Sequence, residues 1–482
     1  MREQLRWPKL PWIPIASGAL WLWLAAAGGL FAKLIGFPLG TIVLASGVAL
    51  LLWPGDRRIP QTLALVSLIG AVLLLPLVGS FGFLASLLLL LASAASFVAA
   101  GLIAIAQEPF TAGVPRPDLS VQLAAQVGID EVILGMEQLS IGLPMGSETQ
   151  RLVREVHEAR ELFESRGWLD DPERYHELPP DLERVELRRA DSRGIAYEHL
   201  QFESGYAPHA GEPGRERWLD LVATRTAHAY VLRQPNGADR PWILCNNGYR
   251  MGHAFSDLRL FRRFHELGLN VLIPVLPLHG PRSVGRQSGD RFLSGEVLDT
   301  VHAEAQAMWD IRRMIAWLRH QGATRIGSYG LSLGGYTTAL LAALVDDLDC
   351  AIAGIPVSDF SRIFWRHGPK LQLDYLGHMG TAQEDAARVF RVVSPLALKP
   401  RVALEGRMIF GAIADRLVTP DHVRDLWEHW GRPRMVWYPG GHCTFALHAS
   451  VQEGVLQTLR DTRLLGEPSS LEASAGVAAR GQ

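Results

Sequence analysis

The sequence predicts an α/β domain built on a mostly parallel sheet, preceded by a group of membrane-spanning helices. The chain has 482 residues, enough for more than one domain, and 48% of them are hydrophobic, but almost all of the apolar excess lies before Ala106. In the second half, short apolar runs alternate with helical patterns, which is typical of a parallel sheet covered by helices on both faces. These two observations divide the chain into a membrane half and an α/β half.

The membrane half, residues 1–107, contains four long apolar segments without a charged residue. Each has about 19 to 26 residues, enough to cross a hydrocarbon core of ~30 Å, so we expect four transmembrane helices. A cleaved signal peptide and buried helices of a soluble protein are alternatives, but the apolar segments continue past any cleavage site and include one very long uncharged run, 61–106. The segments are 11–32, 34–53, 61–79 and 81–106, and Pro76, Gly79, Ser80 and Gly82 mark the turn between the last two.

Basic residues flank these segments unequally, which predicts the orientation in the membrane. One side carries only Lys33, and the other carries the remaining basic residues near the segments. Because basic residues favour the cytoplasmic side, we expect an integral protein of the cell membrane with both termini and the α/β domain in the cytoplasm. The residues on the cytoplasmic side are Arg2, Arg6, Lys9, Arg57, Arg58 and Arg116.

The charge and the cysteines narrow the class of protein. The net charge is −2 and no basic stripe with interleaved aromatic residues occurs, so we expect no nucleic-acid partner. Cys245, Cys350 and Cys443 are odd in number and match no metal-binding or redox spacing, which fits a reducing compartment. No His-Glu-x-x-His or Cys-x-x-Cys pattern predicts a metal site.

A linker, residues 108–180, joins the two halves. Within it, Ser147 to Arg166 shows apolar residues at helical spacing. This amphipathic helix either packs on the following domain or braces the chain at the membrane surface. The α/β domain is expected at 181–465, and the Ser-, Ala- and Gly-rich tail at 466–482 is expected to be disordered.

Within the α/β domain, three short strand patterns suited to an antiparallel edge come before six apolar strand patterns that alternate with helices. We therefore expect a sheet of about eight strands. The strand patterns are 185–189, 196–202, 227–232, 242–245, 271–275, 326–329, 351–355, 408–412 and 435–438, and the helical patterns are 258–267, 297–321, 337–345 and 422–430.

The segment Gly330-Leu331-Ser332-Leu333-Gly334-Gly335 lies between a strand pattern and an Ala/Leu-rich helix. Glycines at this place let the strand and helix approach closely, so Ser332 would stand at the apex of a tight, strained turn near a helix N-terminus. The segment resembles the nucleophile elbow of the α/β-hydrolase superfamily. The resemblance covers about Leu182 to Leu465 and implies a serine hydrolase of esterase or lipase type that needs no metal or organic cofactor.

Two further residues complete the expected catalytic set. Asp415 and His442 each follow a strand pattern, and reactive groups of open α/β sheets collect at the carboxyl ends of the strands. His442 would take the proton of Ser332, and Asp415 would orient the imidazole. The order Ser332, Asp415, His442 is that of the superfamily's triad. Asp359 is a rival acid, since Asp415 could instead be a helix cap.

An oxyanion hole needs two backbone N–H donors. One is expected from Leu333, directly after the nucleophile, and the other from the loop after 242–245, where Gly248 precedes Tyr249. The superfamily often has a His-Gly pair at this place, whereas this sequence has Asn247-Gly248. Tyr249, which follows Gly248, is the expected second donor, and the departure from the superfamily's pair affects this assignment and not that of Leu333.

Two other loops are expected near the site. The loop after 271–275 contains His279, Arg282 and Arg286, and its arginines either bind an anionic substrate group or pair with nearby acidic residues. The insertion at 358–404 holds an aromatic cluster. Insertions here commonly form a lid in the superfamily, and the alternative is that the cluster is ordinary core.

These observations lead to the hypothesis of a membrane-tethered serine hydrolase of carboxylic esters. The tether would hold the site near a bilayer and suggests lipid esters, although a fold does not determine a substrate. A peptidase or amidase would use the same chemistry. A membrane scaffold with a hydrolase-like domain that binds without turnover is the alternative from another class.

Overall fold

The computed structural model describes residues 9–140, 146–182, 184–235, 237, 240–293 and 296–466. These residues form two compact units. The first consists of residues 9–140, 411–421 and 437–449, and the second of the other described residues. Most of the expected tail at 466–482, together with Arg2 and Arg6, lies outside the described residues.

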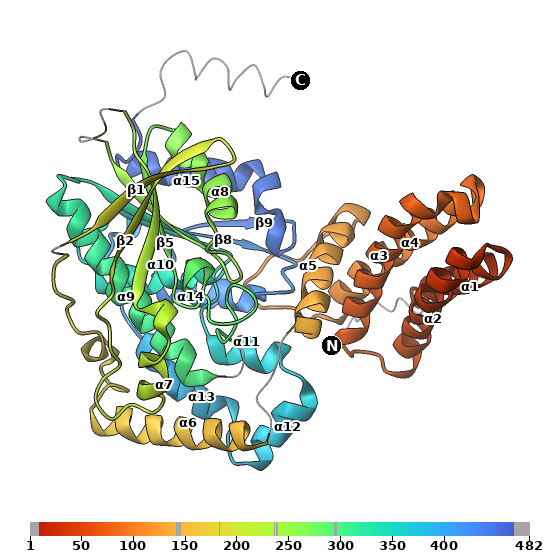
Figure 1. The fold of residues 1–482 in the computed structure, drawn as a ribbon, viewed down its shortest axis with the longest axis horizontal. Helices are drawn as coiled ribbons and strands as arrows, with labels where there is room; N and C mark the ends of the chain where they lie inside the picture. The colour runs from red at the N-terminus through yellow and green to blue at the C-terminus, as the bar shows by residue number, and fades with distance from the viewer. Residues whose placement is uncertain are drawn as a thin grey trace. The chain divides into compact units, whose positions relative to one another are not determined.

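The first unit is built on apolar helices that lie side by side (Figure 1). Among the described helices, α2, α3 and α4 are long and apolar enough to cross a membrane. Helix α1 has only 16 residues, about 24 Å at 1.5 Å per residue, so three helices, and not four, have the expected length. The helices are α1 (Trp12–Ala27), α2 (Leu30–Leu52), α3 (Arg58–Phe81), α4 (Phe83–Gln107) and α5 (Val121–Ser140).

The ends of these helices differ from the expected positions at two places. Gly28 turns to extended backbone and ends α1 inside the first expected segment, because glycine favours helix ends over helix interiors. The turn expected to begin at Pro76 is shorter, since α3 continues through this proline to Phe81 and reverses at Gly82, whose φ is +82°. Neighbouring helices make a proline tolerable inside an apolar helix.

Small residues bring the helices of the first unit into close contact. A Cβ atom on Gly40 of α2 would lie 2.9 Å from the Cβ of Trp21 on α1, and a Cβ on Gly101 of α4 would collide with the carbonyl oxygen of Ala124 on α5. Backbones that approach through small residues are typical of helix packing in membranes. Helix α5 packs on both α3 and α4 (Figure 1).

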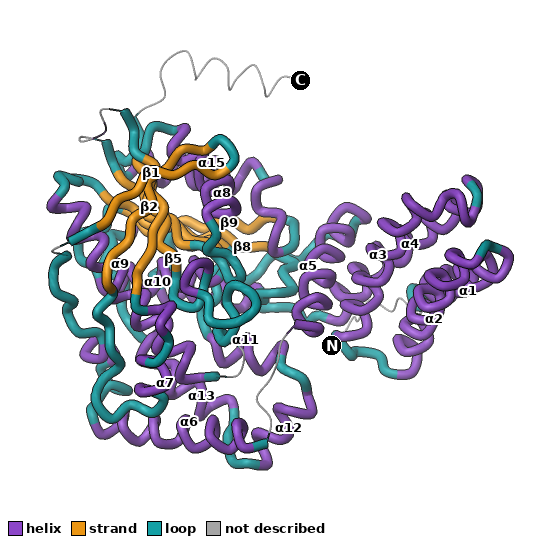
Figure 2. The backbone as a smooth tube through the Cα atoms, in the orientation of Figure 1, coloured by secondary structure: helices purple, strands orange, loops and turns teal. Residues whose placement is uncertain are grey.

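Among the described residues, nine strands form one sheet, in the order β1-β2-β3-β5-β4-β6-β7-β8-β9. Figure 2 colours the strands orange. The antiparallel edge expected at β1 to β3 is present, and β5, β4, β6, β7 and β8 pair in parallel. The fold is α/β, as expected, and the described sheet has nine strands in place of about eight. The strands are β1 (Glu186–Ser192), β2 (Ile195–Glu203), β3 (Thr226–Leu232), β4 (Trp242–Asn246), β5 (Asn270–Val275), β6 (Ile326–Leu331), β7 (Cys350–Gly354), β8 (Arg407–Ala412) and β9 (Arg434–Tyr438).

The helices between the strands lie where the apolar periodicity places them. The expected ones are α8 (Ala254–Glu266), α9 (Val297–His320), α10 (Leu333–Leu344) and α14 (Pro420–His429). The short α7 (Arg215–Leu219) and the longer α15 (Ala449–Asp461) were not predicted. Helix α15 buries Val451, Val455 and Leu459, whose four-residue spacing is the signal that could have revealed it.

Helix α6 (Ser147–Ser165), the amphipathic helix of the linker, packs within the second unit. Its Glu155 pairs with Arg217 at 2.6 Å, and its Arg160 pairs with Asp385 at 2.8 Å. Its apolar face, which includes Phe163, is buried. The packing alternative therefore describes this helix, and its apolar face is not available to a membrane surface.

The insertion at 358–404 forms α11 (Phe360–His367), α12 (Lys370–His378) and α13 (Gln383–Phe390). Phe360 is fully buried and its ring stacks on Tyr336 of α10 with the ring centres 4.0 Å apart. Leu371 of α12, in contrast, is 82% exposed. The aromatic cluster is thus core at α11, and only α12 presents apolar side chains outward.

This difference predicts unequal effects of two truncations. Phe360→Ala should lower the free energy of unfolding by about 3–5 kcal/mol, since it opens a cavity beside the helix that follows Ser332. Leu371→Ala should change it by less than about 0.5 kcal/mol, because little apolar surface is buried there. Denaturant unfolding of both variants in detergent measures the difference, and equal effects would mean that the α11 aromatic cluster is not core.

Candidate active site

Ser332 lies at the turn between β6 and α10. Its φ and ψ are +57° and −115°, a backbone conformation that costs a non-glycine residue about 1–3 kcal/mol. The surrounding chain holds it there, since its N–H donates to the carbonyl oxygen of Gly354 at 2.9 Å and its carbonyl oxygen accepts from Tyr336 at 3.1 Å. This strained geometry, with the serine at the N-terminus of a helix, is the one expected for a nucleophile elbow.

The glycines of the motif are required by this close approach. A Cβ atom on Gly330 would collide with the carbonyl oxygen of Gly334, and a Cβ on Gly334 would collide with the carbonyl oxygen of Asn246 at the end of β4. Asn246 in turn donates to Thr338 of α10 at 2.8 Å. The packing thus agrees with the expectation that small residues let the strand and the helix approach closely here.

The expected oxyanion loop lies beside the serine. A Cβ atom on Gly248 would lie 3.8 Å from the Cβ of Ser332. Leu333 is the first residue of α10, and the first N–H groups of a helix have no acceptor within the helix. These positions suit two donors toward an oxygen bound at Ser332, as expected for Leu333 and for the Gly248-Tyr249 segment.

Asp257, on α8, fixes this loop and was not predicted from the sequence. Its buried carboxylate accepts from the Asn247 side chain at 2.5 Å and from the Gly252 N–H at 3.1 Å. Burial raises its pKa, and hydrogen bonds from Asn247, Ser256 and Gly252 oppose that rise. An aspartate in the first turn of a helix normally indicates a cap, so the sequence alone did not reveal its contact with the loop.

In the loop after β5, Arg282 forms contacts within the protein and not the alternative contact with a substrate. Arg282 is buried, pairs with Asp310 at 2.9 Å and donates to the carbonyl oxygen of Thr224 at 2.8 Å. This arrangement is that of a structural ion pair and does not support a role in binding an anionic substrate. Burial lowers the pKa of His279 to about 4, so this imidazole is neutral at pH 7. Arg286 is exposed.

Asp415 and His442 are brought together in the first unit. The Nδ1 atom of His442 lies 2.7 Å from Oδ2 of Asp415, and both side chains are buried. The other carboxylate oxygen, Oδ1, accepts the N–H groups of Leu417 at 3.0 Å and Val418 at 2.8 Å. Because Asp415 is fixed by its own loop, its free oxygen is presented to the imidazole and sets the tautomer with Nε2 as acceptor.

The charge around His442 favours the protonated imidazole. Burial by itself lowers the pKa of His442, but the charge and hydrogen bond of Asp415 and the charge of Asp130 outweigh it, and the net pKa is raised above 6.5. A base that gains a proton more readily in its site is suited to accept one from a serine hydroxyl.

The rival acid, Asp359, caps a helix. Its Oδ1 accepts the N–H of Arg362 at 3.2 Å and the hydroxyl of Ser361 at 2.7 Å, at the start of α11. It also pairs with the Arg362 side chain at 3.3 Å. The helix-cap reading that was open for Asp415 thus describes Asp359.

Taken together, the structure places Ser332, Leu333 and Gly248 side by side in the second unit. It places Asp415 and His442 in contact in the first unit. One neighbour of the second group was missed by the sequence analysis: Asp130 of α5, whose Oδ2 accepts the N–H of His442 at 2.8 Å. Two adjacent carboxylates, Asp130 and Glu131, inside an apolar helix were the signal that could have found it.

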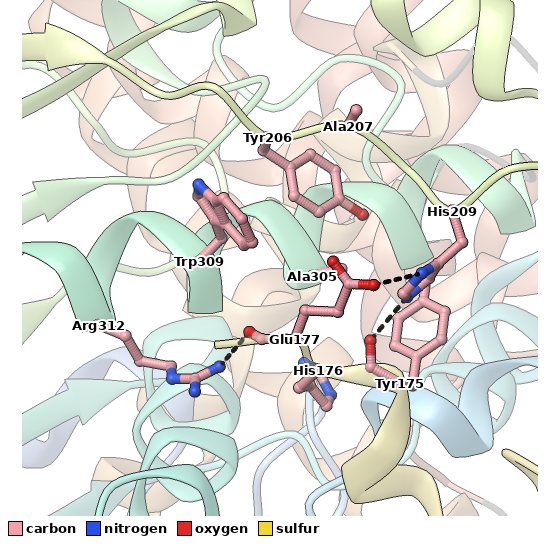
Figure 3. A pocket seen from close by; sticks show the side chains of 9 residues that line it. All are labelled: Tyr175, His176, Glu177, Tyr206, Ala207, His209, Ala305, Trp309 and Arg312. Carbon is pink, nitrogen blue, oxygen red and sulfur yellow. Dashed lines mark hydrogen bonds and ion pairs between the residues drawn. The ribbon is translucent and has the colours of Figure 1, made fainter. Parts of the chain in front are cut away.

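A small pocket in the second unit holds none of the predicted site residues (Figure 3). It lies between α9 and the segments 175–177 and 206–209, and its volume of about 20 Å³ is room for roughly one water molecule. Burial lowers the pKa of His176, at its wall, to about 3. The pocket is therefore too small for an organic substrate.

Comparison with known proteins gives relatives for most of the chain. No protein-family model matches it. The uncharacterized protein MT2702 of Mycobacterium tuberculosis strain CDC 1551 / Oshkosh is 42% identical over 371 residues, which are 76% of this chain and 88% of the relative. The uncharacterized protein Rv2627c of strain H37Rv is 41% identical over the same shares of the two chains.

The chain belongs to the family of these two mycobacterial proteins. Solved structures resemble it more distantly. Acetyl xylan esterase 1 from Thermoanaerobacterium sp. JW/SL YS485 has a TM-score of 0.45 and 14% identity and covers 62% of this chain and 99% of its own. A putative dienelactone hydrolase from Klebsiella pneumoniae has a TM-score of 0.36 and 18% identity and covers 49% and 93%. Likeness at this level carries no argument about activity.

The different surroundings of the two aspartates predict different effects on the reactivity of Ser332. Asp415→Asn should slow labelling by a fluorophosphonate about 10²- to 10⁴-fold, because the amide no longer holds the base in the required tautomer. Asp359→Asn should leave the rate unchanged, since asparagine caps helices about as well as aspartate does. Time courses of labelling measure both rates. The acid would have to be reassigned if the Asp359 variant were the slow one.

Proposed function

We propose that the chain is a serine hydrolase that cleaves carboxylic esters through an acyl-enzyme on Ser332. The observation that carries the proposal is the backbone of Ser332, held at φ +57° at the strand-to-helix turn with Gly248 beside it. Strain of this kind is a feature of functional sites more than of ordinary turns. The buried pair of His442 and Asp415, which follows β9 and β8 in the same sheet, supplies the base and its orienting acid.

The reaction proceeds in two halves. Ser332 Oγ attacks the ester carbonyl carbon while His442 Nε2 accepts the hydroxyl proton, and the carbonyl oxygen becomes an oxyanion that the N–H groups of Leu333 and Tyr249 stabilise. The intermediate collapses, the C–O bond to the alcohol breaks, and His442 returns the proton to the leaving alcohol. Water then repeats the sequence on the acyl-enzyme, releasing the acid and restoring Ser332.

We propose further that α2, α3 and α4 cross the cell membrane and that the substrates are lipid esters. The contacts of the loop that carries Asp415 support this. Arg416, the next residue, forms an ion pair with Glu108, which directly follows the last residue of α4. Oε1 of Glu108 also lies 4.0 Å from a guanidinium nitrogen of Arg57, at the start of α3. The acid of the site would therefore lie at the membrane surface, where esters of lipids are within reach.

The same contact supports a cytoplasmic site. Arg57 and Arg58 belong to the basic side of the apolar helices, and positive residues favour the cytoplasmic face of a membrane. Because Glu108 and Arg57 share one side, the loop of Asp415 would face the cytoplasm.

Labelling of the full-length protein in detergent by a fluorophosphonate tests the reaction. Wild type and Ser147→Ala, an exposed serine of α6, should be labelled equally, and Ser332→Ala should not be labelled, because only Ser332 has an activated hydroxyl. Mass spectrometry should find the adduct on the peptide that contains Ser332. Folded wild type that is not labelled would contradict the proposal and favour a scaffold.

Substrate preference is tested with the same protein in phosphatidylcholine vesicles. Long-chain acyl esters presented in the vesicles should be hydrolysed faster than short soluble esters, and both should exceed the matched anilides. Faster turnover of the anilides would indicate an amidase. Short soluble esters hydrolysed best, with no gain from vesicles, would contradict lipid esters and leave the serine hydrolase standing.

A further inference from the structure

Asp130 lies in the middle of α5 and is completely buried. An aspartate in this position is expensive, because a carboxylate loses its hydration when it is buried among apolar side chains. Its neighbours one helical turn earlier, Gln126 and Val127, are buried as well. A buried carboxylate on an apolar helix face needs donors, and those donors come from two segments 286 and 312 residues later in the chain.

One oxygen of Asp130 joins both loops of the acid–base pair. Its Oδ2 accepts the N–H of His442 at 2.8 Å and the N–H of Arg416 at 3.1 Å. His442 is the expected base, and Arg416 directly follows the expected acid, Asp415. A single atom of α5 therefore fixes the distance between the two loops at the backbone, next to the point where their side chains meet.

The residues next to Asp130 hold the acid loop in a second way. Glu131 pairs with Nε of Arg416 at 2.7 Å, and Glu108 pairs with the same guanidinium. On the apolar side, Ala414 packs against Leu123 and Val127 of α5. Both ends of the short segment 414–416 are thus bound to α4 and α5, and Asp415 lies between them.

The loop of His442 is shaped to fit Asp130. A Cβ atom on Gly441 would lie 2.8 Å from Oδ2 of Asp130 and 3.0 Å from its Cγ. The φ of Gly441 is −98°, which any residue adopts, so the backbone conformation does not demand glycine here. The space occupied by the Asp130 carboxylate does.

We infer that Asp130 is a positioning residue of the hydrolase, a carboxylate of the α5 helix that holds the loops of Asp415 and His442 in register. The inference rests on the proposed function for its catalytic meaning. On this inference α5 is more than a linker. The helix packs on α3 and α4 and also supports the loops of Asp415 and His442.

Asp130 acts on His442 electrostatically as well. Burial and the charge of Asp415 raise the pKa of Asp130 to about 7, although the charge of His442 and the two backbone N–H groups oppose that rise. Cys443, the next residue in the loop of His442, is exposed. The charged and titratable groups around His442 are Asp415 after β8, Asp130 on α5, Cys443 in its own loop, and Arg416 with its partners Glu131 and Glu108.

The test compares the pH dependence of labelling at Ser332 in full-length wild type, Asp130→Asn and Glu137→Gln, a matched change of another carboxylate on α5. Labelling requires neutral His442, so its rate falls as the pH is lowered through the pKa of His442. Asp130 is partly ionised near pH 7, and its charge favours the imidazolium. Asp130→Asn removes that partial charge, so the midpoint should move to lower pH by about half a unit. The rate at the plateau should fall about tenfold, because charged acceptors bind N–H groups more strongly than an amide does.

Gly441→Ala reaches the same contact from the other side. This variant keeps the Asp130 carboxylate, but the added methyl group pushes the carboxylate away from the loop. Labelling should again be slowed, and the midpoint of its pH dependence should change less than in Asp130→Asn. Thermal unfolding of each variant confirms that the labelled samples are folded. Glu137→Gln should match wild type in rate and midpoint.

Hydrogen exchange separates this inference from the proposed function. In Asp130→Asn, amides of 414–418 and 440–445 should exchange faster, whether or not Ser332 reacts. If exchange is faster in Asp130→Asn but wild type is not labelled at Ser332, the proposed function is overturned and the positioning role of Asp130 stands. If both loops exchange as in wild type, and rate and midpoint are unchanged in Asp130→Asn and Gly441→Ala, Asp130 does not position the pair and the inference is overturned.

Discussion

The backbone approach between β6 and α10 is the constraint on which the rest of the second unit depends. Gly330 meets the carbonyl oxygen of Gly334, and Gly334 meets that of Asn246, without room for a side chain at either place. Ser332 is forced into a left-handed conformation between them. A turn of this kind persists only when its surroundings over-determine it, and here β4, β6, β7 and α10 all contribute hydrogen bonds to the segment.

A second constraint operates in the first unit, where charge is buried beside apolar helices. Arg416, Glu131, Glu108 and Asp130 would each be costly alone, and removing one partner of a buried pair typically costs 3–5 kcal/mol in such clusters. Arg416 pairs with both Glu131 and Glu108, and Asp130 accepts backbone N–H groups of Arg416 and His442. These contacts connect the ends of α3 and α4 to the loop after β8. Such clusters add little net stability compared with an apolar core, but they define one arrangement of the loops.

Local sequence patterns were sufficient for the elements whose chemistry is local. Ser332, its flanking glycines and the strands before Asp415 and His442 follow from periodicity and turn chemistry, and the pairing of Asp415 with His442 agrees with their places after β8 and β9. Patterns failed where the partner is distant. The ion-pair alternative for the arginines of this loop named nearby acidic residues, whereas the partner of Arg282 is the more distant Asp310. Helix α5 looked like a linker because its donors come from residues 416 and 442. The break at Gly28 was missed since the apolar run continues across it.

Because Asp130 and His442 are far apart in sequence, they are synthesised at different times. Their contact closes a loop of 312 residues, and at about 5–20 residues per second a ribosome takes roughly 15–60 s to make that length. Helix α5 and the apolar helices are complete long before the loops that they support exist. The turn of Ser332 also precedes the base by more than a hundred residues. In the proposed mechanism, a growing chain therefore carries Ser332 before it carries His442, and hydrolytic competence is confined to molecules whose C-terminal segment has been made.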